Sequence, residues 1–172
     1  MAHFCKIDES NEVKEIHVVA NTDCLDENGN ESEAVGVAFL TKMSGHPLWK
    51  QCSYNTNFTH NADGTVTSIH TLGGTPFRGC YPGKGWFYNA EHDFFHPPKP
   101  YPSWTLNTSA QVWEAPVTYP SNRVCVSAED PNDNIEYRVE WDEANTRWTA
   151  KDKETPPGNF IWNPVTSNWD SA

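Results

Sequence analysis

The chain has 172 residues, a formal charge of −11, and a hydrophobic content of 37%, of which aromatic residues contribute 13% of the chain. This length accommodates one domain or two small ones. The acidic charge argues against direct binding to nucleic acid or to an anionic membrane surface, because both are negatively charged. Aromatic side chains must supply much of the core, and the 13 Pro and 10 Gly residues predict short elements joined by many turns.

The cysteines and the N-terminal residues indicate where the protein is made. The opening stretch MAHFCKIDES has neither the basic start nor the apolar run of a signal peptide. No stretch approaches the roughly 20 apolar residues of a membrane span. We therefore expect a cytoplasm-made protein with reduced structural thiols, with a disulfide or a zinc site as the alternative. The five cysteines form no CxxC pair: Cys5, Cys24, Cys52, Cys80 and Cys125.

The first predicted element is a β-hairpin that begins close to the N-terminus. A polar turn at 8–11 separates two short stretches of strand-like composition. β-Branched residues on both sides of such a turn favour antiparallel strands. The apolar residues that flank the turn are Phe4, Ile7, Val13, Ile16 and Val18.

A polar loop then leads to a predicted α-helix at about 32–44. Ser32 is suited to cap its first turn, and Gly45 suits the left-handed position that follows a helix. Gly36 weakens the helical pattern, because glycine is a poor helix former. The residues that recur at every fourth position predict the face turned toward the core: Val35, Phe39 and Met43.

Strand-like composition returns after the helix, and Asp63-Gly64 favours a tight hairpin turn. The segment 72–85 contains five glycines and is interpreted as a loop between modules. It lacks the GxxxxGK[ST] spacing of a phosphate-binding loop. The first half of the chain therefore predicts strands, one helix and a glycine-rich loop between modules.

The second half repeats one pattern four times. An apolar residue precedes Asn or Asp, five residues follow, and an aromatic residue ends the pattern. Asn and Asp start turns because their side chains accept hydrogen bonds from the backbone two residues ahead. We interpret each repeat as a hairpin whose two end residues pack against each other across the strands. The repeats span 88–95, 106–113, 141–148 and 162–169.

Proline-rich segments at 96–104, 114–122 and 154–159 join these hairpins, and such segments act as stiff extended spacers. The predicted fold is mainly β, with short hairpins, small antiparallel sheets, one short α-helix and many loops and prolines. We expect three modules. They are an N-terminal hairpin, helix and strand module at 1–80, an aromatic hairpin module at 81–116, and a C-terminal hairpin module at 117–172.

No catalytic motif, cofactor motif or convincing metal site emerges from the sequence. His92 and His96 have acidic neighbours and could ligate zinc, but HExxH is absent and the segment carries a hairpin turn. The acidic stretch 129–134 resembles the start of a calcium loop, yet Ile135 replaces the required glycine. Asp142 and Glu143 sit in a turn, where solvation predicts ordinary pKa values. We expect no enzyme, no cofactor and no bound metal.

Two long segments resemble a family of small proteins from tailed phages of marine cyanobacteria and related hosts. They are MAHFCKIDESNEVKEIHVVANTDCLDENGNESE at 1–33 and FRGCYPGKGWFYNAEHDFFHPPKPYPSWTLNTSAQVWEAPV at 77–117. The tryptophan hairpins are similar to those at the ends of phage tail-fibre and accessory proteins. The stretches 58–76 and 121–138 depart from the family pattern.

The resemblance implies a structural protein of the virion, made in the host cytoplasm, that decorates or cements the capsid. Its partners would be the major capsid protein or tail components, with a homo-oligomer also compatible with this role. The alternative is a tail-fibre or baseplate accessory protein whose aromatic residues bind a carbohydrate or receptor. We expect partner contacts among the proline-rich connector 97–104 and the tryptophans: Pro97, Pro98, Pro100, Tyr101, Pro102, Trp104, Trp113, Trp141, Trp148, Trp162 and Trp169.

Overall fold

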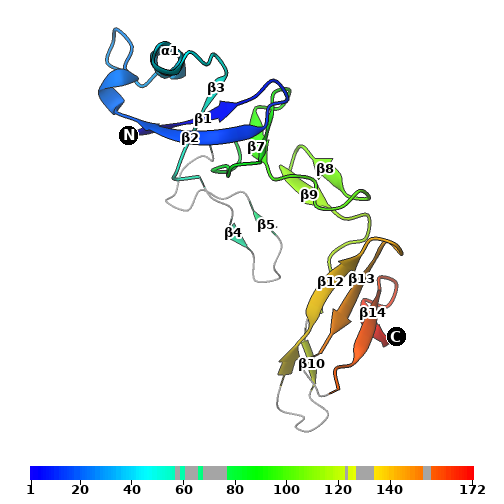
Figure 1. Ribbon diagram of the computed structural model, residues 1–172. Helices are drawn as coiled ribbons and strands as arrows, with labels where there is room; N and C mark the ends of the chain where they lie inside the picture. Colours follow the sequence, from blue (N-terminus) through cyan, green and yellow to red (C-terminus); the bar gives the residue numbers. More distant parts are fainter. Residues whose placement is uncertain (57–58, 61–65, 68–76, 123, 127–133, 153–155) are drawn as a thin grey trace. The chain divides into compact units, whose positions relative to one another are not determined.

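The computed structural model describes the chain except residues 57–58, 61–65, 68–76, 123, 127–133 and 153–155 (Figure 1). It confirms the mainly β prediction, with short antiparallel sheets and one α-helix among the described residues. Contacts between residues divide the chain into two compact units. The first unit comprises Met1–Pro100 and Leu106–Val112, and the second comprises Tyr101–Thr105 and Trp113–Ala172.

A three-stranded antiparallel sheet forms the centre of the first unit. Its strands are β1 (Ala2–Ile7), β2 (Val13–Val19) and β3 (Trp49–Cys52), in the order β2-β1-β3. The predicted N-terminal hairpin is therefore confirmed. Its turn forms because the Asp8 carboxylate accepts hydrogen bonds from the backbone N–H groups of Ser10 and Glu12.

The helix α1 (Glu33–Ser44) follows the short 3₁₀ helix η1 (Asn21–Asp23). Gly45 ends α1 in the predicted left-handed conformation, with φ of 71°. The predicted buried face is right for Phe39, which packs against the core, and wrong for Met43, which is 72% exposed. The buried residues of the helix are Gly36 and Leu40. The helix takes this orientation because the Phe4 ring packs against Gly36, where the absence of a side chain leaves room.

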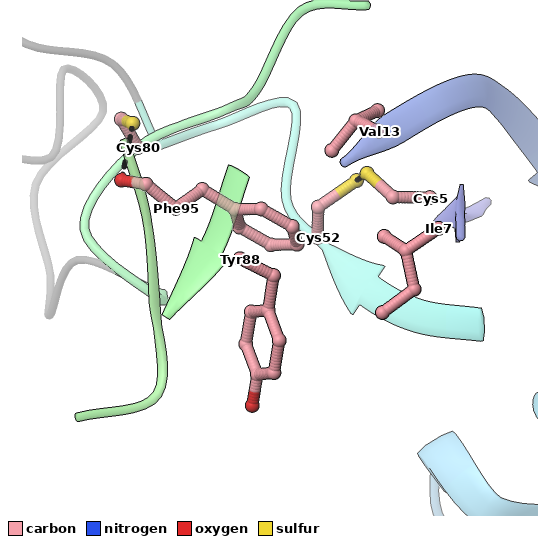
Figure 2. Packing of buried hydrophobic residues seen from close by; sticks show 7 residues of the cluster. All are labelled: Cys5, Ile7, Val13, Cys52, Cys80, Tyr88 and Phe95. Atoms are coloured by element: carbon pink, nitrogen blue, oxygen red, sulfur yellow. Dashed lines mark hydrogen bonds between the residues drawn. The ribbon is translucent and has the colours of Figure 1, made fainter. Parts of the chain in front are cut away.

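Successive residues of β1 point to opposite faces of the sheet, and β1 contributes buried apolar residues to both faces. On one face Ala2 and Phe4 pack with Leu40 of α1. On the other, Cys5 packs with residues of a later hairpin, including Phe95 (Figure 2). The sheet is therefore covered by α1 on one side and by this hairpin on the other.

That covering hairpin consists of β6 (Phe87–Asn89) and β7 (Phe94–His96). It is attached to the start of β2 by backbone hydrogen bonds, because Val13 N–H donates to Trp86 and Tyr88 N–H donates to Asn11. The strands β4 (Thr59–His60) and β5 (Val66–Thr67) also pair antiparallel. The predicted Asp63-Gly64 turn between them lies outside the described residues.

The second unit contains a four-stranded antiparallel sheet, here called the Trp sheet. Its strands lie in chain order and comprise β12 (Arg138–Asp142), β13 (Arg147–Lys151), β14 (Asn159–Asn163) and β15 (Asn168–Ser171). A separate ladder joins β10 (Val124–Val126) to β11 (Asn134–Glu136). The hairpin of β8 (Thr105–Asn107) and β9 (Val112–Glu114) has residues in both units.

All four predicted hairpin repeats form hairpins, and their turns share one geometry. The Asn or Asp side chain accepts backbone N–H bonds from residues two or three positions ahead. The residue four positions after it has a positive φ in every repeat. Four-residue loops of this kind are built around a type I turn. The left-handed residues are Asp93, Gln111, Thr146 and Ser167, with φ between 48° and 60°.

Candidate functional site

The tryptophans of the last two hairpins gather on one face of the Trp sheet. Trp141 pairs with Trp148, and Trp162 pairs with Trp169, in the registers of their hairpins. The ring centroids are 4.9 Å apart in the first pair and 5.2 Å apart in the second. All four side chains are buried. We call such a cross-strand pair with its four-residue turn an aromatic clasp.

Two of these indoles hold a proline-rich segment against the sheet. Trp148 Nε1–H donates to the carbonyl of Val117 at 2.9 Å, and Trp169 Nε1–H donates to that of Asn122 at 2.7 Å. Pro120, between these two carbonyls, is fully buried. The segment 114–122 was expected to be a spacer, and the structure shows that it also covers part of the core.

The connector 97–104 is anchored to the same sheet at one end. Trp104 lies 6.1 Å from Trp141 and 5.8 Å from Trp148, measured between ring centroids. The backbone N–H and hydroxyl of Ser103 donate to the two carboxylate oxygens of Glu143 at 2.8 and 2.7 Å. Glu143 also accepts a bond from Trp141 Nε1–H at 2.7 Å. Glu143 thus links the connector to the first tryptophan clasp.

The structure divides the predicted contact residues into two groups. One group, packed together on the Trp sheet, comprises Tyr101, Trp104, Trp141, Trp148, Trp162 and Trp169. The remaining residues lie outside this cluster, with Pro98, Pro100 and Pro102 exposed and Pro97 and Trp113 half-buried. Among the described residues, Trp104 Nε1 is the only buried side-chain nitrogen or oxygen without a hydrogen-bond partner.

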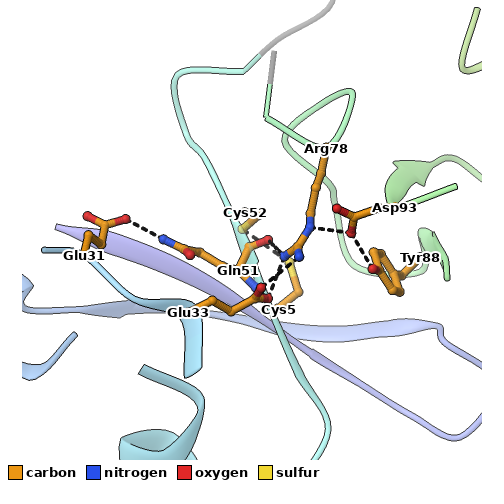
Figure 3. A network of polar contacts seen from close by, with 8 residues as sticks. All are labelled: Cys5, Glu31, Glu33, Gln51, Cys52, Arg78, Tyr88 and Asp93. Carbon is orange, nitrogen blue, oxygen red and sulfur yellow. Dashed lines mark hydrogen bonds and ion pairs between the residues drawn. The ribbon is translucent and has the colours of Figure 1, made fainter. Parts of the chain in front are cut away.

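A polar network that the sequence did not reveal surrounds Arg78 in the first unit (Figure 3). Its guanidinium donates to both carboxylate oxygens of Glu33, at 2.6 and 2.8 Å. It also donates to the Gln51 carbonyl at 2.8 Å and to the Asp93 carboxylate at 2.7 Å. The Tyr88 hydroxyl donates to the same carboxylate of Asp93. The network therefore joins α1, β3 and the β6–β7 hairpin.

This network also protects an exposed sheet edge. β3 is an edge strand, and unpaired edges invite association with other strands. Glu33 accepts the Gln51 N–H at 2.8 Å while Arg78 binds the Gln51 carbonyl. Burial raises the pKa of Glu33, but the bonds from Arg78 and Gln51 outweigh it and hold the pKa below its usual range. No sequence signal marked Arg78, because its partners are distant in the chain.

A hollow of about 470 Å³ lies beside the start of β1 and the end of β3. Tyr54 and Phe77 are among its lining residues and are 64% and 37% exposed. The His3 ring stacks on the Tyr54 ring with centroids 5.9 Å apart. Burial, together with the positive N-terminus, lowers the pKa of His3. The hollow thus combines aromatic surfaces with polar groups.

The residues considered for metal binding or acid–base chemistry are placed as follows. His92 is exposed, and a ring nitrogen of His96 lies 2.8 Å from the Pro97 carbonyl oxygen. The described part of the chain has no group of three or more His, Cys, Asp or Glu residues arranged to hold a metal ion. The calcium-like stretch 129–134 lies almost wholly outside the described residues.

The prediction of an ordinary pKa for Asp142 is wrong. Hydrogen bonds from Asn145 and Arg147 lower the pKa of its carboxyl group.

Three comparisons with known proteins give no relative from which a function could be transferred. No family model, no curated protein and no solved structure matches the chain. Within the described residues, no helix is long and apolar enough to cross a lipid bilayer.

Proposed function

We propose that the chain is a non-enzymatic structural protein of a phage virion that decorates the capsid. It is made in the host cytoplasm and binds the major capsid protein or another virion protein through the connector 97–104. The sequence resemblance supports the virion location. The anchored connector supports the mode of binding.

The observation that carries the proposal is the contrast between the two ends of the connector. Trp104 and Ser103 are held on the Trp sheet by ring contacts and by hydrogen bonds to Glu143. Pro98 and Pro100 are exposed. Proline restricts the backbone before binding, so the proline-rich segment loses less conformational entropy when a partner binds it. The buried tryptophans therefore support the contact surface rather than form it.

The composition of purified particles tests the virion location. Particles would be analysed by mass spectrometry before and after a mild treatment that strips accessory proteins from the capsid. We expect the chain in untreated particles, and its release while tails remain attached. Absence from purified particles would contradict a virion role, whereas retention on isolated tails would contradict capsid decoration.

One observation favours the alternative role in a tail fibre or baseplate. The hollow lined by Tyr54 and Phe77 presents aromatic side chains beside polar ones, as sugar-binding surfaces do. In that case Tyr54→Ala would reduce the adsorption of particles to host cells. Tyr119→Ala, at a 37% exposed aromatic residue of the second unit, provides the matched control. Unchanged adsorption for Tyr54→Ala would contradict this alternative.

A further inference from the structure

We propose that Cys5 and Cys52 are an oxidisable pair, which a peroxide converts to a disulfide that joins β1 to the edge strand β3. The inference goes beyond the proposed function and does not depend on it. It rests on the contact between two thiols, on the different surroundings of the other described thiols, and on a hollow lined by one member of the pair.

The two thiols face each other across neighbouring strands. Cys52 lies opposite His3 in the β1–β3 ladder, so Cys5 is its diagonal neighbour on the same face of the sheet. The Sγ atoms are 3.4 Å apart, although 47 positions separate the residues in sequence. Figure 2 shows the two sulfur atoms pointing toward each other. A disulfide bond is ~2.0 Å long, so the sulfur atoms must approach by only about 1.4 Å.

The other described thiols are engaged elsewhere. Cys80 belongs to the same buried cluster, but its Sγ donates to the Phe95 carbonyl at 3.3 Å. Cys24 lies in the cluster on the opposite, helix-covered face of the sheet. Among the four cysteines whose side chains the structure describes, all are free thiols. Cys5 and Cys52 are therefore the described pair whose sulfur atoms contact each other.

The hollow beside β1 and β3 provides a route for a small oxidant. Cys52 is the last residue of β3 and lines this hollow of about 470 Å³. Cys5 and Cys52 are themselves 0% and 2% exposed, so a bulky disulfide reagent has little access. The adjacent Cys5 thiol and burial raise the pKa of the Cys52 thiol. The reactive thiolate is therefore scarce, and oxidation is slow at neutral pH and faster in alkali.

The reaction balances with one molecule of hydrogen peroxide. The Cys52 sulfur attacks one oxygen, so an S–O bond forms as the O–O bond breaks, and the departing oxygen leaves as water with the thiol proton. The Cys5 sulfur then attacks the sulfenic sulfur, an S–S bond forms, and the S–O bond breaks. The departing hydroxide takes the Cys5 proton as a second water. Two thiols are thereby oxidised by two electrons and one peroxide is reduced.

The bond would close a loop that contains β2 and α1. Linking residues distant in sequence restricts the unfolded chain more strongly than linking near neighbours. We expect oxidation to raise the thermal midpoint of the first unit by roughly 5–10 °C. Dithiothreitol should reverse the rise.

The test uses the full-length chain, reduced, freed of reductant and then treated with hydrogen peroxide. Peptide mapping without reduction, together with thermal unfolding, follows the product. Cys80→Ser keeps the pair and removes the third thiol of the same cluster, whereas Cys52→Ser removes the pair. Wild type and Cys80→Ser should yield a peptide linked through Cys5 and Cys52, with a higher thermal midpoint. Cys52→Ser should yield neither.

Met43, which is 72% exposed, shows whether the peroxide has acted, because it oxidises to the sulfoxide. Sulfoxide at Met43 with both Cys5 and Cys52 still reduced would overturn the proposal. A linkage from Cys52 to Cys80 would overturn it as well. Should Cys52→Ser fail to fold, the peptide maps of wild type and Cys80→Ser still decide the outcome.

Discussion

Four residues with left-handed backbone end the turns of the four hairpin repeats, and none of them is glycine. L-residues in this conformation are strained, and the strain is greatest for a β-branched side chain such as that of Thr146. The preceding Asn or Asp offsets this strain by accepting backbone hydrogen bonds within the turn. The turn residues thus favour this loop conformation in every repeat.

Replacing Thr146 with glycine should therefore stabilise the second unit. Glycine adopts a φ of 48° without strain. The strain that this removes outweighs the greater entropy of glycine in the unfolded chain. We expect a gain of about 0.5–1 kcal/mol in the free energy of unfolding, measured by urea denaturation. The matched variant Thr149→Gly, in the paired strand β13, should instead destabilise the protein. Equal losses in both variants would contradict a strained turn.

The Glu33–Arg78 pair makes the first unit sensitive to acid. The pKa of Glu33 is lower in the folded protein than its ordinary value of 4.5, so the unfolded chain binds the proton more tightly. Stability from this pair is present above pH 4.5 and is lost as pH falls through the folded pKa. Urea denaturation at several pH values should therefore show a steep acid loss in wild type.

Glu33→Gln should reduce the loss of unfolding free energy that occurs as the pH falls, and it should lower the stability at neutral pH. Glu27→Gln, in the exposed loop before α1, is the control and should keep the wild-type pH dependence. The same slope in Glu33→Gln and wild type would show that the pair does not govern acid stability.

At the scale of elements, the helix shows what the sequence could and could not predict. The end of α1 at Gly45 followed from a local signal, because the left-handed position after a helix favours glycine. Ser32 precedes α1 as expected, but its side chain makes no capping hydrogen bond. The buried face of α1 did not follow from local signals, because that face depends on Phe4, which is distant in sequence and packs on Gly36. The Arg78 network was missed for the same reason. Spacing alone does not identify a partner from another element.

Gly36→Ala should destabilise the protein although alanine favours helices. The new methyl group would collide with the Phe4 ring, and overpacking of this kind costs about 1–3 kcal/mol. After the gain of about 1 kcal/mol in helix propensity is subtracted, we expect a net loss of up to about 2 kcal/mol. Urea denaturation measures the difference, with the double variant Phe4→Leu, Gly36→Ala as a test of the collision. A gain in stability from Gly36→Ala alone would contradict the packing.

The clasps were predicted more completely, because their Asn or Asp and their aromatic residues lie close in sequence. The hydrogen bonds from Trp148 to Val117 and from Trp169 to Asn122 were not, since they span 31 and 47 residues. The sequence therefore indicated the hairpins but not the way in which the clasps hold the proline-rich segment.

Trp148→Ala should strongly destabilise the second unit. Trp148 is 6% exposed and packs against Trp141, Trp104 and Tyr119. Its removal leaves a cavity and an unpaired Val117 carbonyl, for a loss of about 3–5 kcal/mol. Tryptophan fluorescence during urea denaturation measures the change. Val165→Ala, at a 92% exposed turn position, should change stability by less than about 0.5 kcal/mol.

At the scale of the whole molecule, two compact units have separate cores. The first is built on the three-stranded sheet and the second on the Trp sheet. The chain first passes from the first unit to the second between Pro100 and Tyr101, within the connector 97–104, and it returns to the first unit at Leu106–Val112 before it re-enters the second. A binding segment at this position would be supported by the second unit through Trp104.

Cross-linking on intact purified particles tests the central claim most directly. An amine-reactive cross-linker can modify Lys99, which lies between the exposed Pro98 and Pro100, and mass spectrometry identifies the linked peptides. Lys42, exposed in the last turn of α1, shows that the reagent has reached the chain. We predict links from Lys99 to another virion protein. Modified Lys42 with no link from Lys99 to another virion protein would contradict binding through the connector.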